Sequence, residues 1–225
     1  KAIGVIETGY RDGFEAGIEA ELEAFVELLE GDVAKNLINL FFMKQQVDKQ
    51  QPYADDVEPR EVEKIGVLGA GLMGAGIAQV AAYEGYEVRM KDVDHEGLAS
   101  GLDYAKGLFD KLVQKRKLSE PMADVAWGRL TGTLDYTGFK QCDLVVEAVF
   151  EDLGLKQKVF SDLLEVAPDD QIFASNTSTI PIEDIGEPTD HPENVCGMHF
   201  FSPVYKMPIL EIIKTDETSD ETVAT

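Results

Sequence analysis

Three glycines in the stretch "KIGVLGAGLMGAGIAQ", residues 64–79, have the spacing of a phosphate-binding turn. In Gly69-x-Gly71-x-x-Gly74 the first glycine can adopt backbone angles that a side chain forbids, and the second leaves room for a bulky anion. The third lets the following helix pack closely on the preceding strand. Unpaired backbone N–H groups and the positive end of the helix dipole meet at such a turn, which suits a pyrophosphate.

An acidic residue follows at the distance expected for a contact with the adenosine ribose. Asp92 lies in "EVRMKDVD", 21 residues after Gly71, and the expected spacing is about 20. The other interpretation is that Asp92 or Asp94 only caps the next helix. A carboxylate at this position repels a 2′-phosphate, so the pattern favours NAD over NADP, while the nearby Arg89 and Lys91 keep NADP open.

A histidine and a glutamate near the end of the chain have the types needed for proton transfer. His199 lies in "VCGMHFFSPV", and histidine is the side chain best suited to act as a general base near neutral pH. A single histidine in an apolar run is more often a hydrogen-bonded core residue. Glu211, however, interrupts the run "PILEII", and a carboxylate buried there needs a partner. With His199 as that partner, Glu211 would orient the imidazole and stabilise the imidazolium.

Further polar residues follow two other apolar runs. "IFASNTST" ends with Asn176, Thr177, Ser178 and Thr179, which could donate to a substrate oxygen or equally cap a turn. In "DLVVEAVFEDLGLKQKVF" the charged residues are Glu147, Glu151 and Lys156. They indicate either an exposed, capped helix start or contacts with the nicotinamide ribose. A basic run, Lys111, Lys115, Arg116 and Lys117, is either a solvated helix face or a contact for substrate phosphates.

Alternating strand and helix patterns are expected to position these residues. The expected strands are 64–69, 87–92, 143–149, 171–175, 194–200 and 209–214, and the expected helices are 72–84, 95–118, 120–129 and 154–166. This alternation predicts an α/β fold with a mostly parallel sheet and helices on both faces. Because ligands bind beyond the carboxyl ends of such strands, polar residues there are the strongest candidates.

The first quarter of the chain has a different pattern. Residues 17–50 show helical spacing on either side of Gly31, and 51–61 are polar, contain two prolines and read as a linker. We therefore expect a helical linker segment at 1–60 and a dinucleotide-binding domain at 61–225.

Composition excludes several classes of protein. The 225 residues carry a net charge of −23, from 43 acidic and 20 basic residues, which argues against nucleic acid or an anionic membrane as partner. No apolar run is long enough to span a bilayer, and the chain is expected to be intracellular. Cys142 and Cys196 have no CxxC partner, so neither a structural disulfide nor a metal site is expected.

Four motifs, in this order, resemble the NAD-binding domain of 3-hydroxyacyl-CoA dehydrogenases: "GAGLMGAGIAQ", "DLVVEAVFEDLGLKQKVF", "FASNTSTIPI" and "GMHFFSPVYKMPILEII". Residues 1–60 are similar to the helical segment that joins an enoyl-CoA hydratase region to this dehydrogenase in the multifunctional fatty-acid oxidation alpha subunit. The resemblance covers essentially the whole chain. It implies a Rossmann-type, doubly wound sheet preceded by a helical linker segment.

The resemblance also implies roles for single residues. By similarity, His199 takes the proton of the 3-hydroxyl while hydride passes to NAD, Glu211 is its partner, and Ser178 hydrogen-bonds the reacting oxygen. The positions that match the cofactor contacts of the family are Gly69, Gly71, Met73, Gly74, Asp92, Val149, Phe150, Glu151, Lys156, Ser178 and Ser202. At Ser202 the family often has asparagine, and a hydroxyl can still hydrogen-bond there. The run near Lys115 lies where the family meets coenzyme A.

The expected function is oxidation of L-3-hydroxyacyl-CoA to 3-ketoacyl-CoA with NAD in fatty-acid β-oxidation, and the alternative is a non-catalytic dinucleotide-binding module. Family members continue into a helical domain that helps to close the active site, whereas this chain stops at "DETSDETVAT". We therefore expect a fragment with little or no turnover of its own. A thiolase beta subunit is an expected partner of the full-length complex. The expected location is the bacterial cytoplasm, with the mitochondrial matrix as the alternative.

Overall fold

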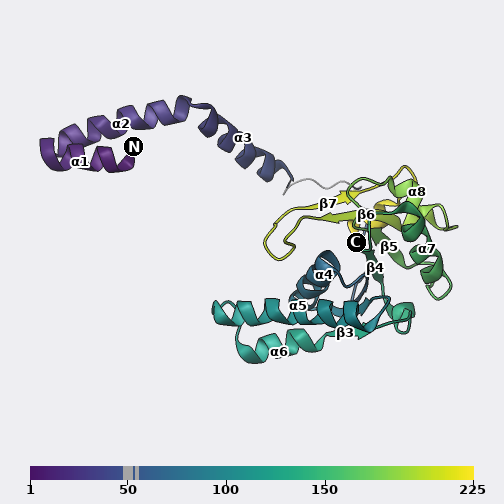
Figure 1. Ribbon diagram of the computed structural model, residues 1–225. Helices are drawn as coiled ribbons and strands as arrows, with labels where there is room; N and C mark the ends of the chain where they lie inside the picture. Colours follow the sequence, from purple (N-terminus) through teal and green to yellow (C-terminus); the bar gives the residue numbers. More distant parts are fainter. Residues whose placement is uncertain (48–52, 54–55) are drawn as a thin grey trace. The chain divides into compact units, whose positions relative to one another are not determined.

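The computed structural model describes residues 1–47, 53 and 56–225. Contacts between residues divide the chain into two units, residues 1–51 and residues 52–225 (Figure 1). Four positions of the predicted linker 51–61, namely 51, 52, 54 and 55, lie outside the described residues. The predicted boundary between residues 60 and 61 stays a prediction.

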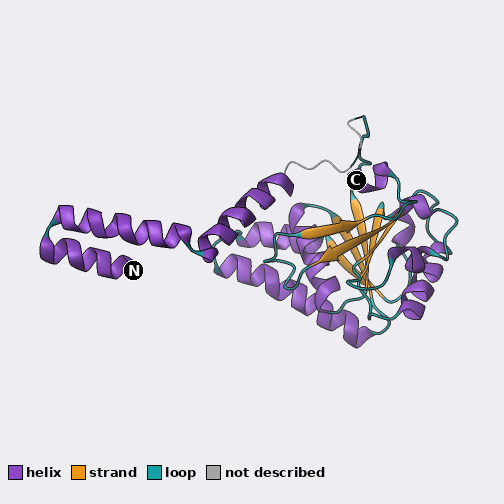
Figure 2. Ribbon diagram, turned by 90° about the horizontal axis from the view of Figure 1, so that it is seen from above, coloured by secondary structure: helices purple, strands orange, loops and turns teal. Residues whose placement is uncertain are grey.

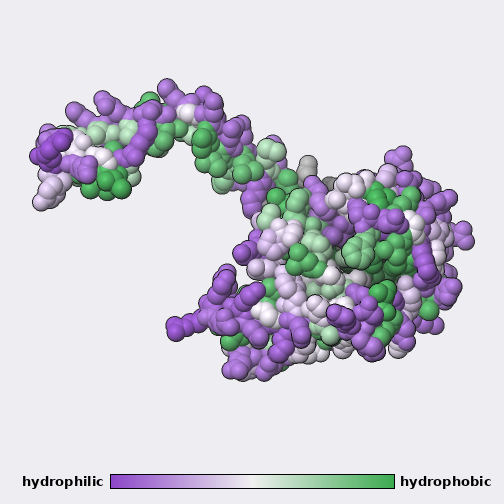
Figure 3. Space-filling view, in the orientation of Figure 1, coloured by the Kyte–Doolittle hydropathy of each residue, from purple (hydrophilic) through white to green (hydrophobic). Residues whose placement is uncertain are grey.

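Three helices make up the first unit: α1 (Ala2–Asp12), α2 (Phe14–Glu30) and α3 (Asp32–Val47). The pattern on either side of Gly31 predicts α2 and α3, but it misses α1, whose two glycines lower its helix propensity. None of the three helices buries a residue. Figure 3 shows apolar side chains along the surface of α2 and α3. Among the described helices of the whole chain, none is long and apolar enough to cross a membrane.

The second unit is a sheet with helices on both faces (Figure 2). Its strands are β1 (Lys64–Leu68), β2 (Glu87–Lys91), β3 (Leu130–Thr133), β4 (Leu144–Glu147), β5 (Ile172–Ser175), β6 (Val195–Phe200) and β7 (Leu210–Ile213). Its α-helices are α4 (Leu72–Glu84), α5 (His95–Gln114), α6 (Glu120–Gly128), α7 (Leu153–Leu164), α8 (Ile182–Gly186) and α9 (Asp220–Ala224).

The seven strands lie in the order β3-β2-β1-β4-β5-β6-β7. All neighbouring pairs are parallel except β6 with β7, which are antiparallel. The expected α/β fold with a mostly parallel, doubly wound sheet is therefore confirmed. Because the chain builds outward from β1 to β3 and then continues with β4 on the other side of β1, the order reverses between β1 and β4. Ligands of such sheets bind at this reversal, beyond the carboxyl ends of the strands.

Successive strand residues point to opposite faces and build two cores. Val67 and Val146 belong to the core under α4, α5 and α6, and their neighbours Leu68 and Val145 belong to the core under α7 and α8. All four are at most 1% exposed. Burial on both faces explains why β1 and β4 read as continuous apolar runs and not as alternating ones.

Several elements differ from the expected ones. The short strand β3 and the helices α8 and α9 were not predicted, because segments of four or five residues carry too little periodicity. The helix expected over 95–118 ends at Gln114, and Arg116 has a φ of 55°. β7 was predicted as a strand, but its antiparallel direction was not.

We predict that Gly74→Ala destabilises the second unit, although alanine normally favours a helix. A Cβ at Gly74 would collide with the carbonyl oxygen of Gly69, and overpacking of this kind costs roughly 1–3 kcal/mol. Gly107→Ala is the control, because Gly107 lies inside α5 with no atom within 4 Å of an added Cβ. It should stabilise by up to about 1 kcal/mol. Urea unfolding measures the free energy of unfolding of both variants. Equal changes in this free energy for Gly74→Ala and Gly107→Ala would contradict the close contact between Gly74 and Gly69.

Candidate active site

The glycine turn joins β1 to α4, as its spacing predicts. Gly69 has a φ of 99°, a left-handed conformation that favours glycine, and a Cβ there would lie 2.7 Å from the carbonyl oxygen of Ala148. Gly74 permits α4 to start directly against Gly69. Gly71 faces open space instead, with no heavy atom within 4 Å of a Cβ built on it. Packing therefore requires the first and third glycines, and the second leaves room beside the helix end.

Unpaired backbone N–H groups of α4 border this open room. Gly71 is the N-cap residue and has no side chain that could accept from the first turn. The N–H groups of Leu72, Met73 and Gly74 consequently have no partner inside the helix. The dipole of this helix of 13 residues adds partial positive charge at the same place. Backbone groups alone thus provide an anion site of the kind that holds a pyrophosphate.

Asp92 lies directly beside the glycine turn. Its Oδ2 accepts from Ala70 N at 2.7 Å, and its Oδ1 accepts from Val93 N at 2.6 Å. Asp94 is the residue that caps α5, because its Oδ1 accepts from Gly97 N at 2.8 Å. Asp92 is therefore not the cap, and its carboxylate retains lone pairs for a ribose hydroxyl.

Glu147 and Lys156 form an ion pair inside the protein. Their side chains are 0% and 1% exposed, and Lys156 Nζ lies 2.9 and 3.1 Å from the two carboxylate oxygens. Glu147 also accepts from Val149 N and from Ser175 Oγ, both at 2.6 Å. Buried charges cost several kcal/mol unless they are paired and hydrogen-bonded. The pair meets this condition by joining the loop after β4, the end of β5 and the helix α7.

Glu151 extends this network to the turn that carries Ser178. Its Oε2 lies 3.3 Å from Lys156 Nζ, and its Oε1 accepts from Thr177 Oγ1 at 2.6 Å and from Ser178 N and Thr179 Oγ1, both at 3.1 Å. Burial raises the pKa of Glu151, but these hydrogen bonds and the charge of Lys156 outweigh it and hold the pKa at about 2. Glu147, Lys156 and Glu151 thus form one charged cluster, the clamp, that fixes the loops after β4 and β5.

His199 and Glu211 face each other on β6 and β7. They are direct partners in the antiparallel register, and His199 Nδ1 lies 2.8 Å from Glu211 Oε2. The His199 side chain is 21% exposed, and the ring of Phe201 packs against it with the centroids 4.7 Å apart. Because a carboxylate only accepts hydrogen bonds, Nδ1 must carry the proton, which leaves Nε2 as the acceptor of the neutral ring. The arrangement provides a base that points one nitrogen away from its partner.

The expectation that Glu211 is buried was wrong. Its side chain is 56% exposed, because β7 is the edge strand of the sheet and all four of its residues are exposed. The apolar residues around Glu211 suggested burial, but Leu210, Ile212 and Ile213 are between 36% and 44% exposed. Glu211 therefore orients His199 from the surface.

The loops after the strands form one row along the carboxyl edge. Asp92 contacts the β1–α4 turn through Ala70, and that turn lies against Ala148 in the next loop. The clamp connects the β4 loop to the β5 loop, and Asn176 of the β5 loop accepts from Phe200 N, next to His199, at 2.9 Å. The row therefore runs from Asp92 to His199 without a gap.

The other predicted site residues lie along or near this row. Phe150 is 86% exposed, Ser178 and Ser202 are exposed, Val149 is half-buried, and Met73 packs against the core from a partly buried position. Lys111, Lys115, Arg116 and Lys117 are exposed around the end of α5. None of the contacts found among the described residues joins this basic run to His199 or Glu211, so a role in holding coenzyme A stays a prediction.

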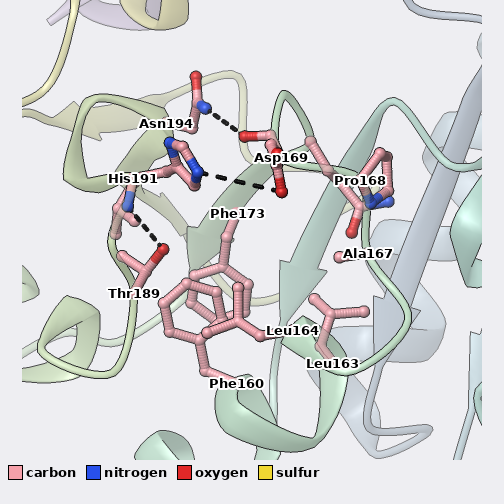
Figure 4. Close-up of a pocket in the computed structure, with 12 residues that line it drawn as sticks. Phe160, Leu163, Leu164, Ala167, Pro168, Asp169, Phe173, Thr189, His191 and Asn194 are labelled. Atoms are coloured by element: carbon pink, nitrogen blue, oxygen red, sulfur yellow. Dashed lines mark hydrogen bonds and ion pairs between the residues drawn. The ribbon is translucent and has the colours of Figure 1, made fainter.

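A small cavity of about 50 Å³ lies at the opposite end of the sheet (Figure 4). Phe160 and Phe173, whose rings stack 3.9 Å apart, form part of its wall, and His191 borders it with Thr189 and Asn194. These segments precede β5 and β6 or end α7, so the cavity lies at the amino ends of the strands. It is separate from the row of loops and too small for a dinucleotide.

Neither cysteine has the properties of a catalytic nucleophile. Burial raises the pKa of Cys142 to about 11 and that of Cys196 to about 12, so both are unreactive thiols near neutral pH. In the part of the chain that the structure describes, no group of three or more histidine, cysteine or acidic side chains is placed to hold a metal ion.

The comparison with protein families agrees with this geometry. Residues 64–225 match the family described as "3-hydroxyacyl-CoA dehydrogenase, NAD binding domain". The chain belongs to this family. The match begins at the first residue of β1 and includes the glycine turn, the clamp and the His199–Glu211 pair. The cofactor of this family is NAD. The matched residues include Gly71, with the open space beside it, and Asp92.

Curated relatives match the whole chain. The fatty acid oxidation complex subunit alpha of Vibrio parahaemolyticus is 42% identical over 222 residues, which are 98% of this chain and 31% of the relative. The subunit of the same name from Idiomarina loihiensis is 43% identical over 226 residues, covering 100% of this chain and 32% of the relative. The chain thus spans about a third of the length of these relatives.

Solved structures support the fold and the family. The 3-hydroxybutyryl-CoA dehydrogenase of Escherichia coli has a TM-score of 0.71 and 35% identity, covering 73% of this chain and 35% of that protein. The (S)-3-hydroxybutyryl-CoA dehydrogenase of Ralstonia eutropha has a TM-score of 0.70 and 36% identity, covering 72% of this chain and 57% of that protein.

We predict that Thr177→Val destabilises the second unit by about 1–3 kcal/mol at neutral pH. It removes a buried hydroxyl that donates to the Glu151 carboxylate and accepts from the N–H groups of Thr179 and Ile180. The pKa of Glu151 is about 2 in the folded state against 4.5 when unperturbed. Its stabilising contribution is therefore complete above about pH 4.5 and is lost as the pH falls toward 2. The part of the Thr177→Val effect that comes from the bond to Glu151 should be lost in the same pH window, and the part that comes from the two backbone N–H groups should remain.

Thr131→Val is the matched control for this prediction. Among the described residues its hydroxyl donates to the carbonyl oxygen of Val88, a group that does not titrate, so its effect should not change between pH 5 and pH 2. Urea unfolding of both variants and the unmodified chain across this range makes the comparison. An effect of Thr177→Val that is the same at every pH would contradict the charge-assisted bond to Glu151.

Proposed function

We propose that this chain holds the dinucleotide and supplies the catalytic base in the NAD-dependent oxidation of L-3-hydroxyacyl-CoA to 3-ketoacyl-CoA. The observation that carries the proposal is the 2.8 Å contact between His199 and Glu211 at the same edge of the sheet as the glycine turn. A module that only binds dinucleotide has no need of an oriented base. The names of the relatives and of the similar structures, given above, support fatty-acid β-oxidation as the setting.

The residues at the edge fit NAD. The open room beside Gly71, with the N–H groups at the start of α4, suits the pyrophosphate. Asp92 would accept from a hydroxyl of the adenosine ribose. Glu151, whose Oε2 is engaged only by Lys156 among the described partners, would face the nicotinamide ribose. We assign further contacts, through side chain or backbone, to Met73, Lys156, Val149, Phe150, Ser178 and Ser202.

Bound NAD would supply the acceptor for the hydride that leaves C3 of the substrate. His199 Nε2 takes the proton of the 3-hydroxyl, so that the C–O bond becomes a carbonyl as the C3–H bond breaks. Glu211 keeps Nδ1 protonated and stabilises the imidazolium that results. Ser178 donates its hydroxyl to the reacting oxygen, and the clamp keeps Ser178 in place through Glu151. The basic run near Lys115 would contact the phosphates of coenzyme A.

The similar proteins also bear on the partner and the location of this chain. Because the relatives are about three times as long and are named as subunits of a complex, we propose that the chain acts as part of a larger protein and that a thiolase beta subunit is its partner there. The relatives named above are bacterial, which supports the bacterial cytoplasm as its location.

We predict that the chain binds NAD more tightly than NADP, because the Asp92 carboxylate repels the 2′-phosphate of NADP and like charges placed together cost several kcal/mol. Asp92→Asn should reduce the ratio of the two affinities by roughly tenfold or more. Asparagine keeps an oxygen for the N–H of Ala70, so the turn should survive. Asp94→Ala is the control, because it removes the cap of α5 without touching the turn. Calorimetric titration with both cofactors decides the point. Equal affinities for NAD and NADP in the unmodified chain would remove Asp92 from this role.

We predict that His199→Gln lowers the rate of NADH formation by roughly 10²-fold or more, the usual scale for a lost general base, and leaves NAD affinity nearly unchanged. NADH absorbance with 3-hydroxybutyryl-CoA as substrate measures the rate. The assay uses a chimera in which this chain replaces the 222 matching residues of the Vibrio parahaemolyticus subunit. An active chimera that tolerates His199→Gln would contradict the proposal, and a chimera that binds NAD without any turnover would favour a dinucleotide-binding module.

A further inference from the structure

The end of β6 extends beyond the strand that pairs with it on one side. β5 ends at Ser175, and its last pair with β6 is Ser175 with Gly197. β6 continues to Phe200 and pairs there only with β7, through His199 with Glu211 and Phe200 with Leu210. The proposed base and its partner therefore lie on a two-stranded extension whose outer strand is exposed.

The side chain of Asn176 supplies a hydrogen bond where β5 no longer runs beside β6. Its Oδ1 accepts from the N–H of Phe200 at 2.9 Å. The backbone N–H of Asn176 faces the opposite neighbour, β4, and continues that ladder by donating to the carbonyl oxygen of Glu147 at 2.8 Å. The side-chain amide thus takes the place of a backbone carbonyl and continues the hydrogen bonding of the sheet by one step.

Asn176 is itself held firmly on both sides. Glu147, whose carbonyl oxygen accepts from it, is fully buried and paired with Lys156. The next residue, Thr177, is 3% exposed and donates to Glu151. Asn176 therefore links the clamp to Phe200, the residue that follows His199, through one hydrogen bond on each side.

We infer that Asn176 is a positioning residue for the His199–Glu211 pair. Without its Oδ1, the half-buried N–H of Phe200 has no acceptor on the β5 side and the extension is free to move. The 2.8 Å contact that keeps the proton on His199 Nδ1 depends on the placement of that extension. The consequence for catalysis rests on the proposed function, whereas the geometry is testable without it.

The direct test is nitrogen-15 NMR of the imidazole rings in the 225-residue chain, at a pH where they are neutral. The chain has three histidines, and His199→Gln assigns the signals of His199. The unmodified chain and Asn176→Asp, which keeps an oxygen in place of Oδ1, should show His199 protonated on Nδ1. Asn176→Ala and Asn176→Leu should shift the proton toward Nε2, the form that free histidine prefers.

Hydrogen exchange of the Phe200 amide gives a second readout. In the unmodified chain it should be protected, and Asn176→Ala should speed it by roughly two- to tenfold, the scale of one lost hydrogen bond. Asn194→Ala is the matched control. It removes an asparagine that bonds Arg60 and the Asp169 carbonyl at the other end of the sheet, so the proton position on His199 and the exchange of Phe200 should both stay unchanged.

Two NMR results would overturn the inference. In the first, His199 keeps its proton on Nδ1 in a folded Asn176→Ala or Asn176→Leu variant. In the second, Asn176→Asp shifts the His199 proton toward Nε2 as Asn176→Ala does. Where the alanine and leucine variants do not fold, the Phe200 amide of the unmodified chain decides, and its exchange at the rate of an open amide would overturn the inference. None of these readouts involves turnover, so the failure of the proposed function would leave them intact.

Discussion

The buried ion pair between Glu147 and Lys156 is the constraint on which the candidate site depends. A carboxylate and an ammonium at 0% and 1% exposure are tolerable only with complete hydrogen bonding, and the donors come from the β4 loop, the end of β5 and α7. Replacing such a buried pair with apolar residues of similar volume often leaves the stability of a core unchanged or raises it. The charged groups differ from apolar ones because their hydrogen bonds are directional, and each bond holds one segment in a fixed position relative to another. Glu151 extends these bonds to the turn that carries Ser178.

The two ends of the row of loops work by different physical means. At the glycine turn the ligand-facing groups are backbone N–H groups, which explains how a chain of net charge −23 can attract an anion locally. At β6 and β7 the reactive groups are side chains near the sheet edge, where His199 is accessible to a substrate. The clamp lies between the glycine turn and the His199–Glu211 pair. The distance from the cofactor site to the base therefore depends on the buried pair of Glu147 and Lys156.

The sequence predicted the features that depend on local spacing. The glycine turn, the acid 21 residues after Gly71 and the alternation of strands and helices all follow from periodicity and backbone sterics. The exposure of Glu211 could not be predicted, because apolar neighbours look the same on an edge strand and in a core. The bond from Ser175 to Glu147 and the bond from Phe200 to Asn176 were equally hidden. Each joins two different strands or the loops after them, and the order of the strands cannot be predicted from spacing along the chain.

Backbone amide NMR during titration with NAD would show whether one row of loops along the carboxyl edge holds the cofactor next to the base. We expect the largest chemical-shift changes to occur together at residues 70–74, 149–151 and 176–179, with smaller changes around His199. The amide signals at the amino ends of β5 and β6 should stay unchanged. Shifts centred on the cavity beside Phe173 and His191, or shifts confined to the glycine turn while 176–179 and His199 remain unaffected, would contradict it.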